Sequence, residues 1–156
     1  MKFSAATKTK KSYDINTKSN LPQLEDVNYD EAKAKDLVNS ALTNAESKPI
    51  GYCARYVKNA IANTGLGAYQ SGHAYQCDDI LANNSNFKEI NINGSDLKKL
   101  PAGCVIVYDR GAAGYSSQYG HIEITTGKGN AVSDFVSRTI KESNDVRVFV
   151  PVKQVA

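Results

Sequence analysis

The sequence predicts an α+β fold in which helices from the first half of the chain pack against an antiparallel β-sheet from the second half. Residues 28–83 contain segments with the periodicity of helices, whereas residues 100–152 contain the short apolar or alternating segments of strands. Helices followed by strands, rather than alternating with them, indicate an antiparallel sheet with the helices on one side. The chain has 156 residues, 41% of them hydrophobic and 22% charged, which fits one globular domain.

Three helices are expected before the strands. In residues 28–46, NYDEAKAKDLVNSALTNAE, apolar residues recur every three or four positions, and acidic residues occupy the first turn, where the helix dipole favours them. The second helix is predicted to run from Cys53 to about Asn63, with Gly65 as its C-terminal stop. Residues 74–83, AYQCDDILAN, fit a third helix.

Four strands are expected in the second half of the chain. LPAGCVIVYDR (residues 100–110) is a continuous apolar run after a Pro-Gly turn, and YGHIEITT (119–126) alternates. AVSDFVS (131–137) follows the turn GKGN, and VRVFVPV (146–152) is the last strand.

The charge and hydropathy of the chain argue against two classes of partner. The net charge of +3 is too small to indicate nucleic-acid binding, and no apolar run approaches the ~18 residues of a membrane span. Residues 1–22 are basic and polar and lack the apolar segment of a secretory signal. We expect a flexible arm at 1–22 and a single domain, acting as a monomer, at 23–156.

The chain has three cysteines, Cys53, Cys77 and Cys104. In an oxidising compartment Cys77 and Cys104 could form a disulfide and leave Cys53 free. The alternative is three reduced thiols.

Cys53, in the stretch IGYCARYVKNAI, is the first candidate for a reactive side chain. At a helix N-terminus the exposed N–H groups and the dipole stabilise a thiolate, and the same groups can bind an oxyanion. Gly51 would let a substrate backbone approach closely. The alternative is that Cys53 is only a small residue at the start of an apolar helix.

A nucleophilic thiol needs a base, and the chain has two histidines. His73 lies in the loop SGHAYQ without an acidic neighbour, so we expect it to be structural or to lie at a cleft edge. His121 lies in the predicted strand YGHIEI. His121 is therefore the better candidate for the base.

The predicted hairpin gives His121 two acidic neighbours. If GKGN closes the hairpin so that residue 127 pairs with residue 130, then His121, Glu123 and Asp134 share one sheet face, and the Asp134 carboxylate can reach the ring. A shift of one residue would turn Asp134 to the other face. Glu123 is an alternative partner for His121 or a solvated strand residue, and Asp134 is alternatively a plain surface carboxylate.

Other charged residues in the helices give no sign of a cofactor site. Arg55 and Lys58 lie away from the apolar stripe of the second helix and are expected to be solvated. Asp78 and Asp79 lack the spacing of metal ligands, so no metal site is predicted.

Four stretches together resemble the CHAP domains, the cysteine, histidine-dependent amidohydrolases/peptidases related to papain-like cell-wall hydrolases. They are GYCARYVKNAI, AYQ…IL, LPAGCVIVYD and YGHIEITTGKGNAVSDF, in the family's order and spacing over about residues 48–137. The chain departs from the family by carrying Cys104 where an aspartate often follows the glycine. The family's third catalytic member is also often Glu or Asn rather than Asp.

The resemblance implies a papain-like α+β fold and hydrolysis of amide bonds in the peptide part of peptidoglycan, without a cofactor. Cys53 matches the nucleophile, His121 the base and Asp134 the third member, which holds the imidazole. The expected mechanism is attack by the Cys53 thiolate, protonation of the leaving amine by His121, and hydrolysis of the thioester. We also expect Tyr52, Tyr119 and Glu123 to contact the substrate.

The bond that is cut and the biological setting stay open. The enzyme would be an N-acetylmuramoyl-L-alanine amidase or an endopeptidase, with specificity set by loops 65–73 and 111–119. Alternatives are an amidase acting on protein glutamine or a polyamine conjugate, and an inactive wall-binding module. The protein would act in the periplasm or cell wall, either as a phage endolysin after holin release or as a type VI secretion effector with an immunity protein as partner.

Overall fold

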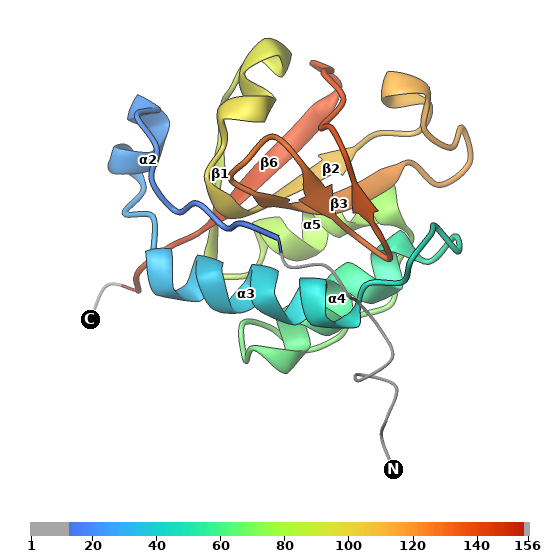
Figure 1. The fold of residues 1–156 in the computed structure, drawn as a ribbon, viewed down its shortest axis with the longest axis horizontal. Coiled ribbons are helices and arrows are strands. Elements are labelled where there is room, and N and C mark those ends of the chain that lie inside the picture. The colour runs from blue at the N-terminus through green and yellow to red at the C-terminus, as the bar shows by residue number, and fades with distance from the viewer. Residues whose placement is uncertain (1–12, 155–156) are drawn as a thin grey trace.

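The computed structural model describes residues 13–154 and contains helices and one six-stranded antiparallel sheet (Figure 1). The strand order is β1-β6-β2-β3-β4-β5. The strands are β1 (Phe87–Ile90), β2 (Ala102–Tyr108), β3 (His121–Thr126), β4 (Ala131–Val132), β5 (Val136–Ser137) and β6 (Val146–Pro151). Each neighbouring pair is antiparallel, so the predicted α+β class is confirmed.

The helices precede most of the sheet, as predicted. They are α2 (Pro22–Asp26), α3 (Glu31–Asn44), α4 (Cys53–Asn63) and α5 (Cys77–Ala82), with the 3₁₀ helices η1 (Ala74–Gln76), η2 (Gly94–Lys99) and η3 (Ala112–Gly114). The first two predicted helices are confirmed as α3 and α4, and the third is divided between η1 and α5. Among the described residues, no helix is long and apolar enough to cross a membrane.

The sheet differs from the prediction at two places. The strand expected at residues 131–137 is divided into β4 and β5, because the chain bends between them. The four residues of β1 were not predicted as a strand. Only its two end residues are buried, so its sequence, FKEI, has no apolar run or alternation long enough to detect.

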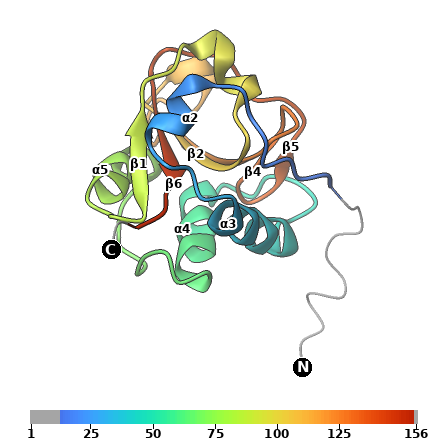
Figure 2. The ribbon, with the colours of Figure 1, turned by 90° about the vertical axis from the view of Figure 1, so that its left-hand side faces the viewer.

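Apolar side chains cover both faces of the sheet. On one face α3, α4 and α5 pack through residues such as Leu37, Val57 and Leu81. On the other, α2 and η2 contribute Leu24 and Leu97. Figure 2 shows α3 and α4 on one side of the strands and α2 on the other. The prediction of helices on one side therefore holds for the long helices, but the opposite face is covered as well.

The three cysteines are free. Cys77 lies in the core between the helices and the sheet, whereas Cys104 lies in the core on the opposite face of β2. The considered disulfide is therefore absent, and three free thiols are confirmed. Burial raises the pKa of Cys77 to about 11 and that of Cys104 to about 12, so both stay protonated at neutral pH.

The segment expected to be a flexible arm is described only from residue 13. There, Asn16 joins the edges of two strands: its N–H donates to the Thr126 carbonyl at 2.9 Å, and its carbonyl accepts from the Ala102 N–H at 2.7 Å. Ile15 packs against the core on the helix side. This part of the segment is anchored, while the expectation for residues 1–12 lies outside the described residues.

A bulge at Gly103 lets α3 approach the sheet closely. The β2–β3 register shifts between Ala102 and Val105, and Gly103 adopts φ +81°. A Cβ atom on Gly103 would lie 2.5 Å from the Cα of Ala34 on α3, closer than any real contact. The glycine therefore serves both the bulge and the helix–sheet packing.

We predict that Gly103→Ala lowers the free energy of unfolding by about 3 kcal/mol, because the added methyl meets backbone and the positive φ strains any L-residue. The matched control is Gly129→Ala. Gly129 has φ +82°, but a Cβ there would meet nothing within 4 Å, so only the strain of about 1 kcal/mol is expected. Urea denaturation of both variants measures the difference, and equal losses would show that the contact with α3 does not matter.

Candidate active site

Cys53 is the first residue of α4 and is half-buried. Tyr52 precedes it as the N-cap residue, and no side chain caps the helix there. The first N–H groups of α4 are therefore available to stabilise negative charge on the thiol or on a bound oxygen.

His121 is the first residue of β3 and lies opposite Tyr108 of β2. Its side chain is 12% exposed and lies close enough to Cys53 for the thiol to raise the pKa of the imidazole. The fold thus brings the end of a strand against the start of a helix that is distant in sequence. A thiol and an imidazole that interact in this way are the minimum set for thiol-based nucleophilic catalysis.

Glu123 is the acidic partner of His121. The His121 Nε2–H donates to Oε1 of Glu123 at 2.9 Å. The other carboxylate oxygen lies 3.1 Å from the Tyr108 hydroxyl, which also lies 3.0 Å from the Lys141 carbonyl. Glu123 is only 1% exposed, so it is neither a solvated strand residue nor placed to touch substrate. Of the interpretations of Glu123, only that of a partner for His121 fits its contacts.

Asp134 is not the partner of His121, because the hairpin has a different register from the one expected. The structure pairs Ile124 with Val132, whereas the expected register pairs residue 124 with residue 133. A shift of one residue reverses which face each side chain occupies. Asp134 is 2% exposed, so it is not a surface carboxylate either, and it accepts hydrogen bonds from the N–H groups of Ile50 and Tyr52.

The surroundings of His121 favour its charged form. Burial alone would lower the pKa of His121, but the hydrogen bonds to Cys53 and Glu123 outweigh it and raise the pKa from 6.5 to about 9. The Tyr115 ring stacks on the imidazole, with centroids 4.0 Å apart and planes 11° apart. The raised pKa keeps the imidazole protonated at neutral pH.

Exposed aromatic and aliphatic side chains flank the Cys53–His121 pair. Ile50 and Tyr52 lie three residues and one residue before Cys53, and Tyr119 lies two residues before His121; these three are 43–48% exposed. The His73 ring lies 4.8 Å from the Tyr119 ring, which places His73 at the edge of this surface. Exposed aromatic side chains near a thiol in the chain are candidates for contact with a substrate.

Lys58 is buried rather than solvated, contrary to the prediction. It is 7% exposed, and its Nζ donates to the Gly72 carbonyl at 2.7 Å and lies 4.6 Å from the centroid of the Tyr69 ring. Lys58 therefore ties the loop after α4 to the helix that begins with Cys53. Arg55 is exposed, as predicted, and lies over the Tyr52 ring.

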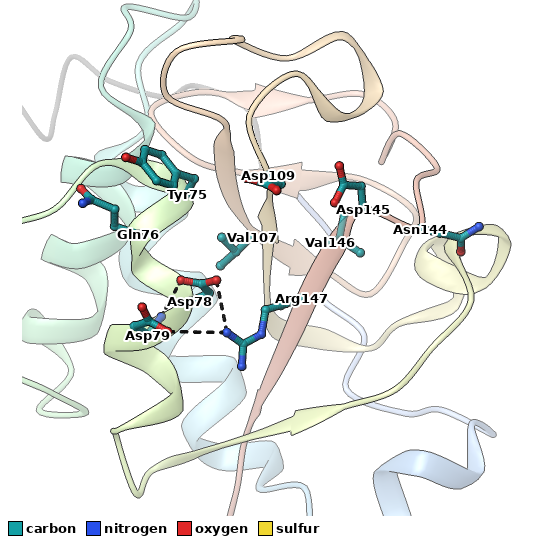
Figure 3. Close-up of a pocket in the computed structure, with 10 residues that line it drawn as sticks. All are labelled: Tyr75, Gln76, Asp78, Asp79, Val107, Asp109, Asn144, Asp145, Val146 and Arg147. Atoms are coloured by element: carbon teal, nitrogen blue, oxygen red, sulfur yellow. Dashed lines mark hydrogen bonds and ion pairs between the residues drawn. The ribbon is translucent and has the colours of Figure 1, made fainter.

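A cavity of about 400 Å³ lies between α5 and the ends of β2 and β6 (Figure 3). Arg147 from β6 points toward Asp78 and Asp79 of α5 and pairs with them at 3.2 and 3.8 Å. Neither Cys53 nor His121 lines this cavity. Of the four carboxylates that line the cavity, Arg147 pairs with Asp78 and Asp79. Among residues 13–154, no group of three His, Cys, Asp or Glu side chains is arranged to hold a metal ion.

Three residues around the site were missed by the sequence analysis. Lys58 had a detectable signal, since it falls three residues before Ile61 and four after Ala54, within the apolar stripe of α4. Tyr108 and Tyr115 had none, because their positions depend on strand register and on the fold of a loop.

The comparisons with known proteins agree with this geometry. The CHAP domain family model matches residues 43–144, which include Cys53, His121 and Glu123. Two solved structures of the type VI effector–immunity complex Tae3–Tai3 from Ralstonia pickettii are similar. In the native form the TM-score is 0.55 with 26% identity over 73% of this chain and 94% of that chain. In the selenomethionine form the values are 0.54, 25%, 72% and 97%. No curated protein matches the chain.

We predict that Glu123→Gln lowers the pKa of His121 below its value of about 9, because the substitution removes the buried charge that favours the imidazolium. NMR titration of the ring Cε1–H signals measures this pKa, and a His73→Gln background leaves one histidine to assign. Because the folded-state pKa is raised, the wild-type free energy of unfolding should fall as the pH rises from about 6.5 through about 9. An unchanged pKa in the variant would rule out Glu123 as the charge that holds His121.

Proposed function

Because the chain belongs to the CHAP domain family, we propose that it is a peptidoglycan hydrolase that cleaves an amide bond of the peptide stem or cross-link with Cys53 as nucleophile. The observation that supports this most directly is the contact of the Cys53 thiol, at the start of α4, with a His121 whose pKa is raised to about 9. The reaction is either that of an N-acetylmuramoyl-L-alanine amidase or that of an endopeptidase.

In the proposed mechanism the Cys53 thiolate attacks the amide carbonyl and forms a tetrahedral intermediate. Its oxyanion binds at the N-terminus of α4, where the backbone N–H of Cys53 is one donor. His121 donates its proton to the leaving amine as the C–N bond breaks, which leaves a thioester on Cys53. Water then attacks the thioester, His121 takes a proton from it, and the acid product leaves with the thiolate restored.

Glu123 takes the role that the sequence analysis gave to Asp134. Its bond to Nε2 leaves the other imidazole nitrogen, Nδ1, to face Cys53. The buried carboxylate also stabilises the imidazolium that exists before the amine is protonated. The set of residues proposed for catalysis is therefore Cys53, His121 and Glu123.

The similarity to the Tae3–Tai3 effector–immunity complex supports delivery by a type VI secretion system rather than holin release. On this proposal the protein acts in the periplasm of a rival cell and has an immunity protein as partner. The exposed side chains of Tyr52 and Tyr119 suit contact with a peptide or sugar and are proposed to bind substrate. Loops 65–73 and 111–119 are proposed to select the bond.

We predict that wild-type protein releases soluble fragments from purified peptidoglycan and that Cys53→Ala releases none, because no other group on the proposed pathway can form the thioester. Mass spectrometry of the fragments identifies the bond. A free stem peptide with an L-alanine N-terminus indicates the amidase, and shortened or uncoupled stems indicate the endopeptidase. Equal digestion by wild type and variant would contradict the proposed nucleophile, and no digestion by either would contradict the substrate.

Glu123→Ala is expected to lower kcat on the same substrate by roughly 10²-fold, because His121 loses both its orienting bond and its stabilising charge. Glu142, which is exposed, provides the control: Glu142→Ala should retain full activity. Circular dichroism checks that the Glu123→Ala protein is folded. Wild-type kcat in a folded Glu123→Ala protein would remove Glu123 from the mechanism.

A further inference from the structure

Asp134 is a buried carboxylate that the proposed mechanism does not use. It lies between β4 and β5 and is 2% exposed. An ionised carboxylate is costly to bury unless donors surround it, so its position requires an explanation.

The donors come mainly from the turn that precedes the nucleophile. Oδ2 of Asp134 accepts from the Ile50 N–H at 2.9 Å and from the Tyr52 N–H at 3.1 Å, and Oδ1 accepts from the Ser133 hydroxyl at 3.1 Å. One carboxylate oxygen thus binds the backbone on both sides of Gly51. The second of these N–H groups belongs to the residue directly before Cys53.

The same strand segment holds the chain where it leaves α3. The Glu46 N–H donates to the Asp134 carbonyl at 2.7 Å, and Glu46 forms a parallel bridge with Phe135. The Glu46 carboxylate accepts from the Tyr56 hydroxyl at 2.5 Å, and Tyr56 lies on the first turn of α4. Residues 46–52 are therefore attached to the segment around Asp134 at both ends.

Packing contributes little to the conformation of this turn. Ile50 is 43% exposed and Tyr52 is 48% exposed. Gly51 is exposed, has φ +83°, and a Cβ there would meet nothing within 4 Å. With few side-chain contacts to fix the turn, the two hydrogen bonds to Asp134 are the main constraint on the backbone that leads into Cys53.

We propose that Asp134 is a positioning residue: its carboxylate fixes the turn at residues 50–52 and so holds the Cys53 thiol in contact with His121. The expected effect on catalysis rests on the proposed function, whereas the effect on the turn does not. A displacement of about 1 Å in a reacting group lowers rates by up to about 10²-fold, so the effect belongs in kcat rather than in KM.

The test compares Asp134→Ala with Asp134→Asn. The asparagine retains one side-chain oxygen that can accept both N–H groups, while its NH₂ group can donate to the Ser133 hydroxyl. Alanine retains neither. The control is Asp36→Ala, which removes an exposed carboxylate from α3. The measurements are kcat and KM on peptidoglycan, the rate of Cys53 alkylation by iodoacetamide, and amide hydrogen exchange at Ile50 and Tyr52.

For Asp134→Ala we expect kcat to fall by about tenfold to 100-fold with little change in KM, slower alkylation of Cys53, and faster exchange of the Ile50 and Tyr52 amides. Asp134→Asn should keep kcat and the alkylation rate within about threefold of wild type, because its oxygen replaces the acceptor. Asp36→Ala should match wild type in all measurements.

Two results would overturn the proposal. One is a folded Asp134→Ala protein with wild-type kcat and unchanged exchange at Ile50 and Tyr52. The other is an Asp134→Asn protein as slow as Cys53→Ala with exchange unchanged, which would mean that the charge matters and the turn does not. If the Asp134→Ala protein does not fold, the proposal is judged from kcat, Cys53 alkylation and amide exchange in the Asp134→Asn protein. Alkylation and exchange need no peptidoglycan, so they separate failure of this proposal from failure of the proposed function.

Discussion

The buried carboxylate of Glu123 is the constraint on which the site depends. A negative charge that is 1% exposed is stable only with donors or a cation beside it, since removing an ion from water costs several kcal/mol. Here the donors are the imidazole N–H of His121 and the hydroxyl of Tyr108. Both come from paired positions of β2 and β3, so the strand register, the buried charge and the orientation of the imidazole are set together.

Two buried carboxylates position different parts of the site. Glu123 orients the imidazole from within the sheet, and Asp134 binds the turn before Cys53 from the neighbouring strand segment. The difference follows from the elements involved. His121 is part of a strand with fixed neighbours, whereas Cys53 follows an exposed turn that side-chain packing barely restrains. The position of a nucleophile at the first residue of a helix therefore depends on hydrogen bonds to the turn that precedes the helix.

The sequence was sufficient for the long elements and for the Cys53–His121 pair, but not for the acid. Helices α3 and α4 have an apolar period that repeats several times, and β2 and β6 are apolar runs, so local pattern determines them. The prediction of the acidic partner of His121 depended on the register of the β3–β4 hairpin. The actual register differs from the expected one by one residue, and the partner is Glu123 rather than Asp134. The cause is the length of the turn: Thr126 and Asn130 are hydrogen-bonded around three residues, 127–129, whereas the expected register placed two residues at the tip. Lys58 is the opposite case: its spacing from Ala54 and Ile61 places it in the apolar stripe of α4, but its charge led to the wrong prediction that it is solvated.

The raised pKa of His121 also has a consequence for the two halves of the proposed reaction. Two of the contributions that raise it, a hydrogen bond and a charge, come from Cys53. When the thiolate bonds to the substrate carbon in the tetrahedral intermediate, both contributions are lost while those of Glu123 remain, so the pKa of His121 must fall from about 9 before the amine leaves. A lower pKa makes the imidazolium a stronger acid when the amine has to leave, and then brings the neutral ring closer to the optimum for a base near pH 7 when water attacks. The interaction of His121 with Cys53 and Glu123 thus keeps the imidazole protonated before attack and lets it give up the proton when the amine leaves.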